Sequence, residues 1–249
     1  MIDKKFMDDS ENLSDDCFEE KLTNEIMQNT QTDYEYILDQ VAEINPDSIV
    51  LEPRSTFNRA IIGSDPDGRL VDSANKIMDF LNSNISYEQI VITSSTRVYG
   101  LGNKRDITEA ILPLPDDIQG KIILDYEKLV SKESKVEPLI LRPSGLYDNH
   151  SHWMQKHVQT FKGKKFPLRF VEANMFDRNQ LSKIIKNYIQ DKEFSKVTGP
   201  LICSDSAIKY REIFSTVCPD YSFDDFFISS DETGKTFNPQ KLIDSGLMR

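Results

Sequence analysis

Apolar residues recur along the chain in short continuous runs and in longer segments with helical spacing. The runs Ser48–Leu51, Gln89–Thr93 and Pro138–Leu141 predict buried strands, because each is brief and is bounded by polar or turn-forming residues. The segments 69–81 and 119–132 lie between them and predict helices, the first with its apolar side chains along one face. Strands that alternate with helices in this way predict an α/β fold with a parallel sheet.

The same pattern extends on both sides of this central region. A helix through Tyr36 and Ile44 is predicted to end near Asn45-Pro46, since the residue before a proline disfavours helical backbone. Pro200–Cys203 predicts another short strand. The acidic aromatic stretch Asp220–Phe227 is irregular, and we expect it on a surface loop or an edge strand. An amphipathic helix beyond residue 150 is marked by four residues, Leu181, Ile184, Ile185 and Tyr188.

Charge and composition divide the chain and limit its partners. Residues 1–30 carry nine acidic and three basic side chains with little apolar surface, which predicts either a mobile arm or an acidic interaction segment. We therefore expect three parts, 1–30, an α/β domain at 31–150 and an extension at 151–249. A net charge of −11 argues against nucleic acid as a partner. The absence of a run of about 18 apolar residues predicts no membrane span and a cytoplasmic protein.

Few residues suggest metal or redox chemistry. The cysteines Cys17, Cys203 and Cys218 have no metal-ligand spacing and predict ordinary thiols. The histidines lie close together in sequence, and an H-x-H pair is able to bind a divalent metal, but a loop leading into a helix is the preferred interpretation. We therefore expect no metal site from the three of them, His150, His152 and His157.

Three segments with characteristic spacing carry a family resemblance. Thr93–Gly100 contains Ser-Ser-Thr-Arg-Val-Tyr-Gly at the end of a predicted strand, Leu141–Tyr147 reads Leu-Arg-Pro-Ser-Gly-Leu-Tyr, and Ile44–Val50 precedes both. Together they resemble the extended or atypical short-chain dehydrogenases/reductases, which include NAD(P)-dependent nucleotide-sugar epimerases and dehydratases. The resemblance implies a partial Rossmann-like, doubly wound parallel sheet with a small C-terminal α/β extension.

The resemblance assigns expected roles to individual residues. Ser95 occupies the position of the family's hydroxyl residue, which hydrogen-bonds the substrate oxygen. A remaining pocket is expected to be lined by residues near it, namely Tyr99, Arg142, Pro143 and Tyr147.

Two parts of the family's chemistry are missing from their expected places. The first glycine of the chain is Gly63, so no glycine-rich dinucleotide turn precedes it. Gln119 and Ile123 stand where the Tyr-x-x-x-Lys pair is expected. The nearest phenol, Tyr126, is the remaining candidate for a displaced catalytic acid, although a half-buried helix tyrosine is the preferred interpretation. An atypical subgroup that also lacks the pair has a Pro-x4-Gly-x6-Glu spacing, which is similar to Pro115, Gly120 and Glu127 here.

These observations predict a divergent protein that acts by binding a protein partner or a nucleotide-like ligand, without a cofactor on the isolated chain. The alternative is an NAD(P)-dependent nucleotide-sugar epimerase, dehydratase or reductase. In the complete family fold another strand lies beside the one at Ser48–Leu51. We therefore expect its edge to be covered by residues 1–30, by a second copy of the chain or by a different subunit.

Overall fold

The structure is a computed structural model. The predicted acidic arm, the glycine at Gly63 and the three histidines lie outside the residues that it describes. The described residues are 41–51, 69–102, 104–147, 158–161, 164–167, 170–223, 226–228 and 232–249.

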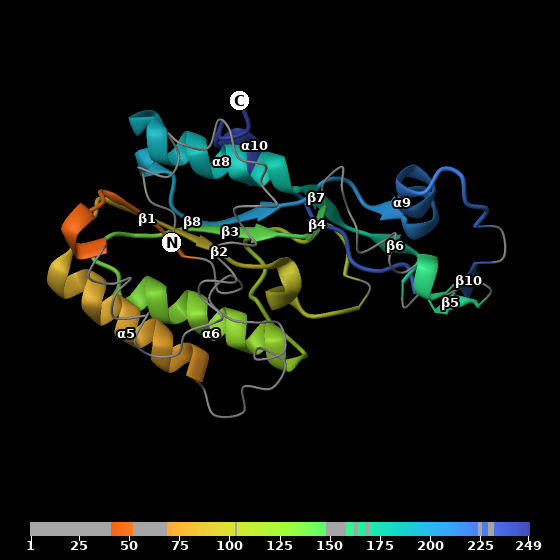
Figure 1. Cartoon of the computed structure of the whole chain (residues 1–249), viewed down its shortest axis with the longest axis horizontal. Helices are drawn as coiled ribbons and strands as arrows, with labels where there is room; N and C mark the ends of the chain where they lie inside the picture. The colour runs from red at the N-terminus through yellow and green to blue at the C-terminus, as the bar shows by residue number, and fades with distance from the viewer. Residues whose placement is uncertain are drawn as a thin grey trace. The chain divides into compact units, whose positions relative to one another are not determined.

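Four strands form the main sheet, in the order β1-β2-β3-β8 (Figure 1). They are β1 (Ser48–Leu51), β2 (Gln89–Thr93), β3 (Leu139–Pro143) and β8 (Gly199–Cys203). β1 and β2 run parallel, and their register places Ser48 opposite Gln89 and Leu51 opposite Ile92. All four predicted strands are confirmed to within two residues, and so is the α/β, Rossmann-like class. Within the described residues β1 ends the sheet; what covers its outer edge stays a prediction.

The described residues divide into two compact units. The first contains the described residues up to Ser94 together with Ile122–Ile140, and the second contains Ser95–Lys121 and Leu141–Arg249. The domain boundary predicted at residue 150 falls outside the described residues and stays a prediction.

The first unit packs two helices beside β1 and β2. These are α5 (Arg69–Asn84) and α6 (Ile118–Glu133), which lie side by side and are joined where Asn82 Nδ2 donates to the carbonyl of Glu133 at 2.7 Å (Figure 1). Both predicted helices are confirmed. Tyr126 was predicted to be half-buried, but only 2% of it is exposed, because it packs into the apolar core of this unit. The preceding helix ends as predicted, at Asn45, whose φ of 45° breaks the helical backbone.

The second unit is built from short elements. Four apolar residues anchor α8 (Arg178–Gln190), and they are the four that the sequence predicted: Leu181, Ile184, Ile185 and Tyr188. Three two-stranded sheets accompany it: β4 (Gly145–Tyr147) with β7 (Met175–Asp177), β5 (Phe166–Pro167) with β10 (Phe227–Ile228), and β6 (Glu172–Ala173) with β9 (Ile208–Lys209). The remaining elements are η2 (Thr96–Tyr99), η3 (Lys192–Lys196), α9 (Tyr210–Val217) and α10 (Gln240–Asp244). None of the described helices has the length and apolar character needed to cross a membrane.

The acidic aromatic stretch differs from its prediction. Phe223 and Phe226 are only 3% and 4% exposed, and they pack with Phe214 of α9 in a cluster of phenylalanine rings. The prediction of an edge strand holds only for Phe227, which begins β10. The physical reason is that these large rings leave water by packing on one another, although the residues between them in sequence are acidic.

Candidate functional site

A polar turn follows β2 directly. Ser95 has extended backbone, is 7% exposed and caps the N-terminus of η2, where its Oγ accepts the main-chain N–H of Arg97 at 3.2 Å. Gly100 ends the turn with a φ of 74°. Because a hydroxyl oxygen can accept one bond while its hydrogen donates another, this geometry leaves the Ser95 O–H suited to act as a donor.

The turn is tied to the end of β3. Arg142 Nη1 donates to the Tyr99 hydroxyl at 2.7 Å, and both side chains are buried. Thr96 Oγ1 donates to the carbonyl of Pro143 at 3.3 Å. Four of the predicted site residues, Ser95, Tyr99, Arg142 and Pro143, therefore belong to one hydrogen-bonded arrangement within the second unit.

The two remaining predicted residues lie elsewhere. Tyr147 is on β4 and packs against the phenylalanine cluster, where burial and the carboxylates of Asp205 and Asp177 raise its pKa. Tyr126 belongs to the core of the first unit. Whether any of the predicted residues binds a ligand stays a prediction.

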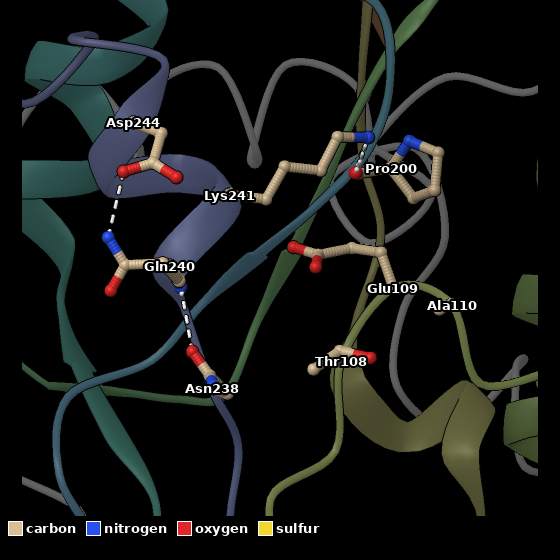
Figure 2. Close-up of a pocket in the computed structure, with 8 residues that line it drawn as sticks. All are labelled: Thr108, Glu109, Ala110, Pro200, Asn238, Gln240, Lys241 and Asp244. Atoms are coloured by element: carbon tan, nitrogen blue, oxygen red, sulfur yellow. Dashed lines mark hydrogen bonds between the residues drawn. The ribbon is translucent and has the colours of Figure 1, made fainter.

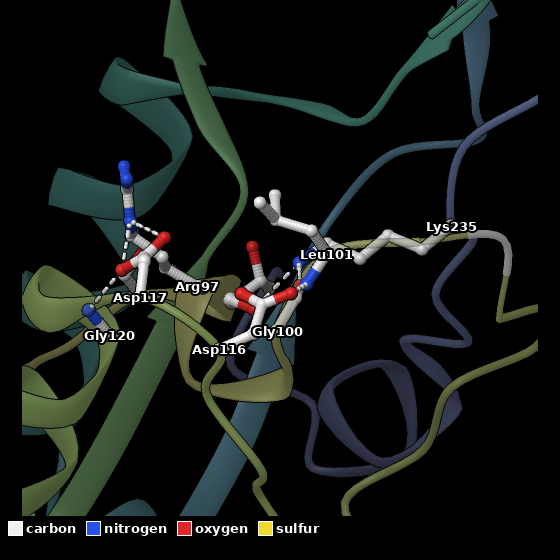
Figure 3. A network of polar contacts seen from close by, with 9 residues as sticks. Arg97, Gly100, Leu101, Asp116, Asp117, Gly120 and Lys235 are labelled. Carbon is white, nitrogen blue, oxygen red and sulfur yellow. Dashed lines mark hydrogen bonds and ion pairs between the residues drawn. The ribbon is translucent and has the colours of Figure 1, made fainter. Parts of the chain in front are cut away.

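The loop before α6 is held by an ion pair. Arg97 Nε donates to both carboxylate oxygens of Asp117, at 3.0 and 2.8 Å, and Asp117 also accepts the Gly120 N–H at 2.7 Å (Figure 3). Burial raises the pKa of Asp117, but the hydrogen bonds from Arg97 and Gly120 outweigh it and hold the pKa below its usual value. Asp117 thus caps the start of α6 as an anion.

The Pro-x4-Gly-x6-Glu spacing has a structural explanation. A Cβ on Gly120 would lie 2.8 Å from Pro115 Cβ and 2.9 Å from the Arg97 carbonyl, so only glycine fits there. Within the first unit, Ser94 Oγ donates to the buried carboxyl of Glu127. Each of the three residues therefore has a packing or hydrogen-bonding role.

Lys235, near the C-terminus, also reaches this turn, although no sequence motif predicts a role for it. Lys235 Nζ donates to the main-chain carbonyls of Thr96 and Gly100, more than 130 residues earlier in the chain (Figure 3). No periodicity or motif marks Lys235, so only the tertiary structure identifies it.

A hollow of about 560 Å³ also lies in the second unit (Figure 2). Two of its charged groups bind the β8 backbone: Glu109 Oε1 accepts the Ile202 N–H at 2.7 Å, and Lys241 Nζ donates to the Pro200 carbonyl at 3.0 Å. None of the predicted site residues lines it. The lining residues are Thr108, Glu109, Ala110, Pro200, Asn238, Gln240, Lys241 and Asp244.

The described side chains and helix N-termini limit which metals or cofactors the chain is able to bind. Among the described side chains, no three His, Cys, Asp or Glu residues are grouped so as to hold a metal ion. The Ser95 hydroxyl fits a ribose or sugar oxygen of NAD(P) or of its substrate. A pyrophosphate requires free N–H groups at a helix start, and α6 already presents its own to Asp117. No helix whose preceding residues are described follows a glycine-rich turn, so the fit to NAD(P) is partial.

Solved structures of known proteins identify the fold of this chain, whereas sequence comparisons do not. No protein-family model and no curated protein sequence matches the chain. The enzyme WbmG of Bordetella bronchiseptica, solved with NAD and UDP, is 13% identical with a TM-score of 0.65 over 88% of this chain and 72% of that chain. UDP-N-acetylglucosamine 4-epimerase from Bacillus cereus is 20% identical with a TM-score of 0.62, over 84% and 76%.

The dTDP-glucose 4,6-dehydratase of Bacillus anthracis, solved with NAD, is 14% identical with a TM-score of 0.63, over 85% of this chain and 70% of that chain. At such low identity the likeness establishes the fold alone. The chain therefore has the Rossmann-like fold found in NAD-dependent epimerases and dehydratases.

Proposed function

We propose that this chain binds a nucleotide sugar at the turn Ser95–Gly100 and takes part in an NAD(P)-dependent epimerase, dehydratase or reductase reaction. The observation that carries the proposal is the hydrogen-bonded arrangement of this turn with Arg142 and Pro143. Open α/β sheets bind their ligands beyond the carboxyl ends of their strands, where this turn begins. The likeness to enzymes solved with NAD and UDP supports the same assignment.

In this proposal, Ser95 and Arg142 have different roles. Ser95 donates its hydroxyl hydrogen to a ligand oxygen, while the Arg97 N–H fixes the position of its Oγ. Arg142 holds the Tyr99 ring and hydroxyl in place through a buried, charge-assisted hydrogen bond. NAD(P), when bound, supplies the hydride chemistry.

A second candidate function is ligand binding without turnover. Ile123 is 3% exposed and apolar at the position expected for the family's lysine, and the amide of Gln119 cannot exchange a proton as a phenol does. With neither group available there, the acid–base step requires a different residue. This candidate matches our interpretation of the sequence, whereas the likeness to solved enzymes favours turnover.

Thermal unfolding and calorimetry with UDP, UDP-glucose, dTDP-glucose, NAD⁺ and NADPH test the proposal. We expect UDP-glucose or dTDP-glucose to raise Tm, because a ligand at about 100 times its Kd stabilises the native state by about 2.7 kcal/mol. Binding of both nucleotide types, with an absorbance change at the reduced-nicotinamide band, supports the enzyme. Binding of the sugar nucleotide alone supports the second candidate.

The matched variants are Ser95→Ala and Ser195→Ala. Ser95→Ala is expected to weaken sugar-nucleotide binding about tenfold, because one hydrogen bond to the ligand is lost. Ser195 is exposed on η3 and donates to its own helix, so its replacement should leave binding unchanged. No heat and no Tm change with any of the five nucleotides would contradict both candidates.

A further inference from the structure

The segment Gly234–Asn238, here named the C-terminal strap, runs alongside the loop that follows the polar turn. The Thr236 N–H donates to the Lys104 carbonyl at 3.0 Å, and the Thr236 carbonyl accepts the Ile107 N–H at 2.9 Å. The Asn238 N–H continues the pattern, donating to the Ile107 carbonyl at 2.9 Å. These main-chain bonds fix the strap in register, so its side chains enter the second unit at defined places.

The Lys235 side chain leaves the strap and enters the turn. Its Nζ donates to the carbonyl of Thr96 at 3.2 Å and to the carbonyl of Gly100 (Figure 3). These carbonyls belong to the peptide groups whose N–H groups are those of Arg97 and Leu101. The ammonium therefore contacts one end of each of two peptide groups.

The other ends of the same two peptide groups are also hydrogen-bonded. The Arg97 N–H donates to Ser95 Oγ at 3.2 Å, and the Leu101 N–H donates to Asp116 Oδ2 at 2.9 Å. A cation on a carbonyl polarises that peptide group and strengthens the bond that its N–H donates. Lys235 is thus linked to the Ser95 hydroxyl through a single peptide group.

We propose that Lys235 is a positioning residue for Ser95: its ammonium, held by the C-terminal strap, orients the serine hydroxyl through the peptide group between Thr96 and Arg97. The inference rests on the proposed function for its effect on ligand binding. Its structural part, the coupling of Lys235 to the turn, can be measured without any ligand.

The charge on Lys235 can be varied by pH. Burial lowers the pKa of Lys235 to about 8, the carboxylates of Asp116 and Asp117 oppose that shift, and the cations Arg97 and Lys104 add to it. Below pH 8 the ammonium makes charge-assisted hydrogen bonds to the two carbonyls. Above pH 8 the neutral amine makes weaker ones, so polarisation of the two peptide groups declines.

Backbone NMR of the uniformly labelled full chain between pH 6.5 and 9.5 tests the coupling. We expect the amide nitrogens of Arg97 and Leu101 to shift together with a midpoint near pH 8. The shift should be absent in Lys235→Met. It should persist in Lys241→Met, because Lys241 is bonded to no residue of the turn. Lys241 is a matched control, since it also donates to a main-chain carbonyl, that of Pro200.

Ligand binding supplies the second readout. In Lys235→Met, UDP-glucose affinity at pH 7 should fall about tenfold, and its dependence on pH above 8 should disappear. Lys235→Gln retains a donor without the charge, and it replaces the methionine variant if that variant does not fold. Lys241→Met should bind as the wild type does.

The NMR titration and the binding measurement test the Lys235 coupling and the proposed function separately. Amide nitrogens that do not titrate in the wild type, or that titrate equally in Lys235→Met, overturn the coupling. Normal UDP-glucose affinity in a folded Lys235→Met overturns the positioning role. If the wild type binds none of the nucleotides, the proposed function fails, and the NMR titration alone decides whether Lys235 orients the turn.

Discussion

Gly100→Ala is expected to lower the free energy of unfolding by about 3 kcal/mol and to abolish nucleotide binding. Gly100 has φ 74° and ψ −167°, a backbone region that is essentially restricted to glycine. An added Cβ would also lie 2.7 Å from the main-chain carbonyl oxygen of Leu114, which cannot move as a flexible side chain can. The turn that carries Ser95 must therefore rearrange.

Gly102→Ala is the matched control for this variant. Gly102 also has a positive φ, 108°, but a Cβ there would meet no atom within 4 Å. We expect a loss of about 1 kcal/mol from backbone strain alone. Urea denaturation followed by far-ultraviolet circular dichroism gives both values. Equal losses in the two variants would show that the contact with Leu114 does not constrain the turn.

Phe214→Ala is expected to destabilise the protein by about 4 kcal/mol. Phe214 is fully buried, and its ring centroid lies 5.4 Å from that of Phe227 and 5.8 Å from those of Phe166 and Phe223. Removing the ring takes a large apolar side chain out of this cluster and leaves a cavity where it was. The measurement is the same denaturation experiment.

Ile228→Ala provides the comparison for Phe214→Ala. Ile228 lies on β10 beside the cluster, and 49% of it is exposed. A surface truncation of this kind typically changes stability by less than about 0.5 kcal/mol. If Phe214→Ala cost no more than Ile228→Ala, the phenylalanine cluster would not be a core of the second unit.

Much of the fold could be predicted because it depends on local periodicity. The strand Ser48–Leu51 and the strand Gln89–Thr93 match the structure residue for residue, since continuous apolar runs of that length are buried on both faces of a parallel sheet. The burial of Phe223 and Phe226 in the stretch Asp220–Phe227 could not be predicted. The rings of this stretch pack against Phe166 and Phe214, and no local pattern records such contacts between distant segments.

In the candidate site, too, some residues could be predicted from the sequence and one could not. Ser95, Tyr99, Arg142 and Pro143 were identified from short motifs, and the structure brings them into one arrangement. Lys235 was missed because its bond to Thr96 spans 139 residues and depends on the register of the C-terminal strap. Sequence motifs mark the groups of a site, whereas the groups that position them are visible only after folding.

Hydrogen–deuterium exchange with and without saturating UDP-glucose reports where the ligand protects the backbone, and so locates the binding site. If the sugar nucleotide binds at the turn that begins with Ser95, exchange slows in peptides covering Ser95–Leu101 and Arg142–Tyr147, with no change in peptides covering Thr108–Ala110 and Asn238–Asp244. Protection confined to the latter peptides, which line the hollow near β8, would contradict it.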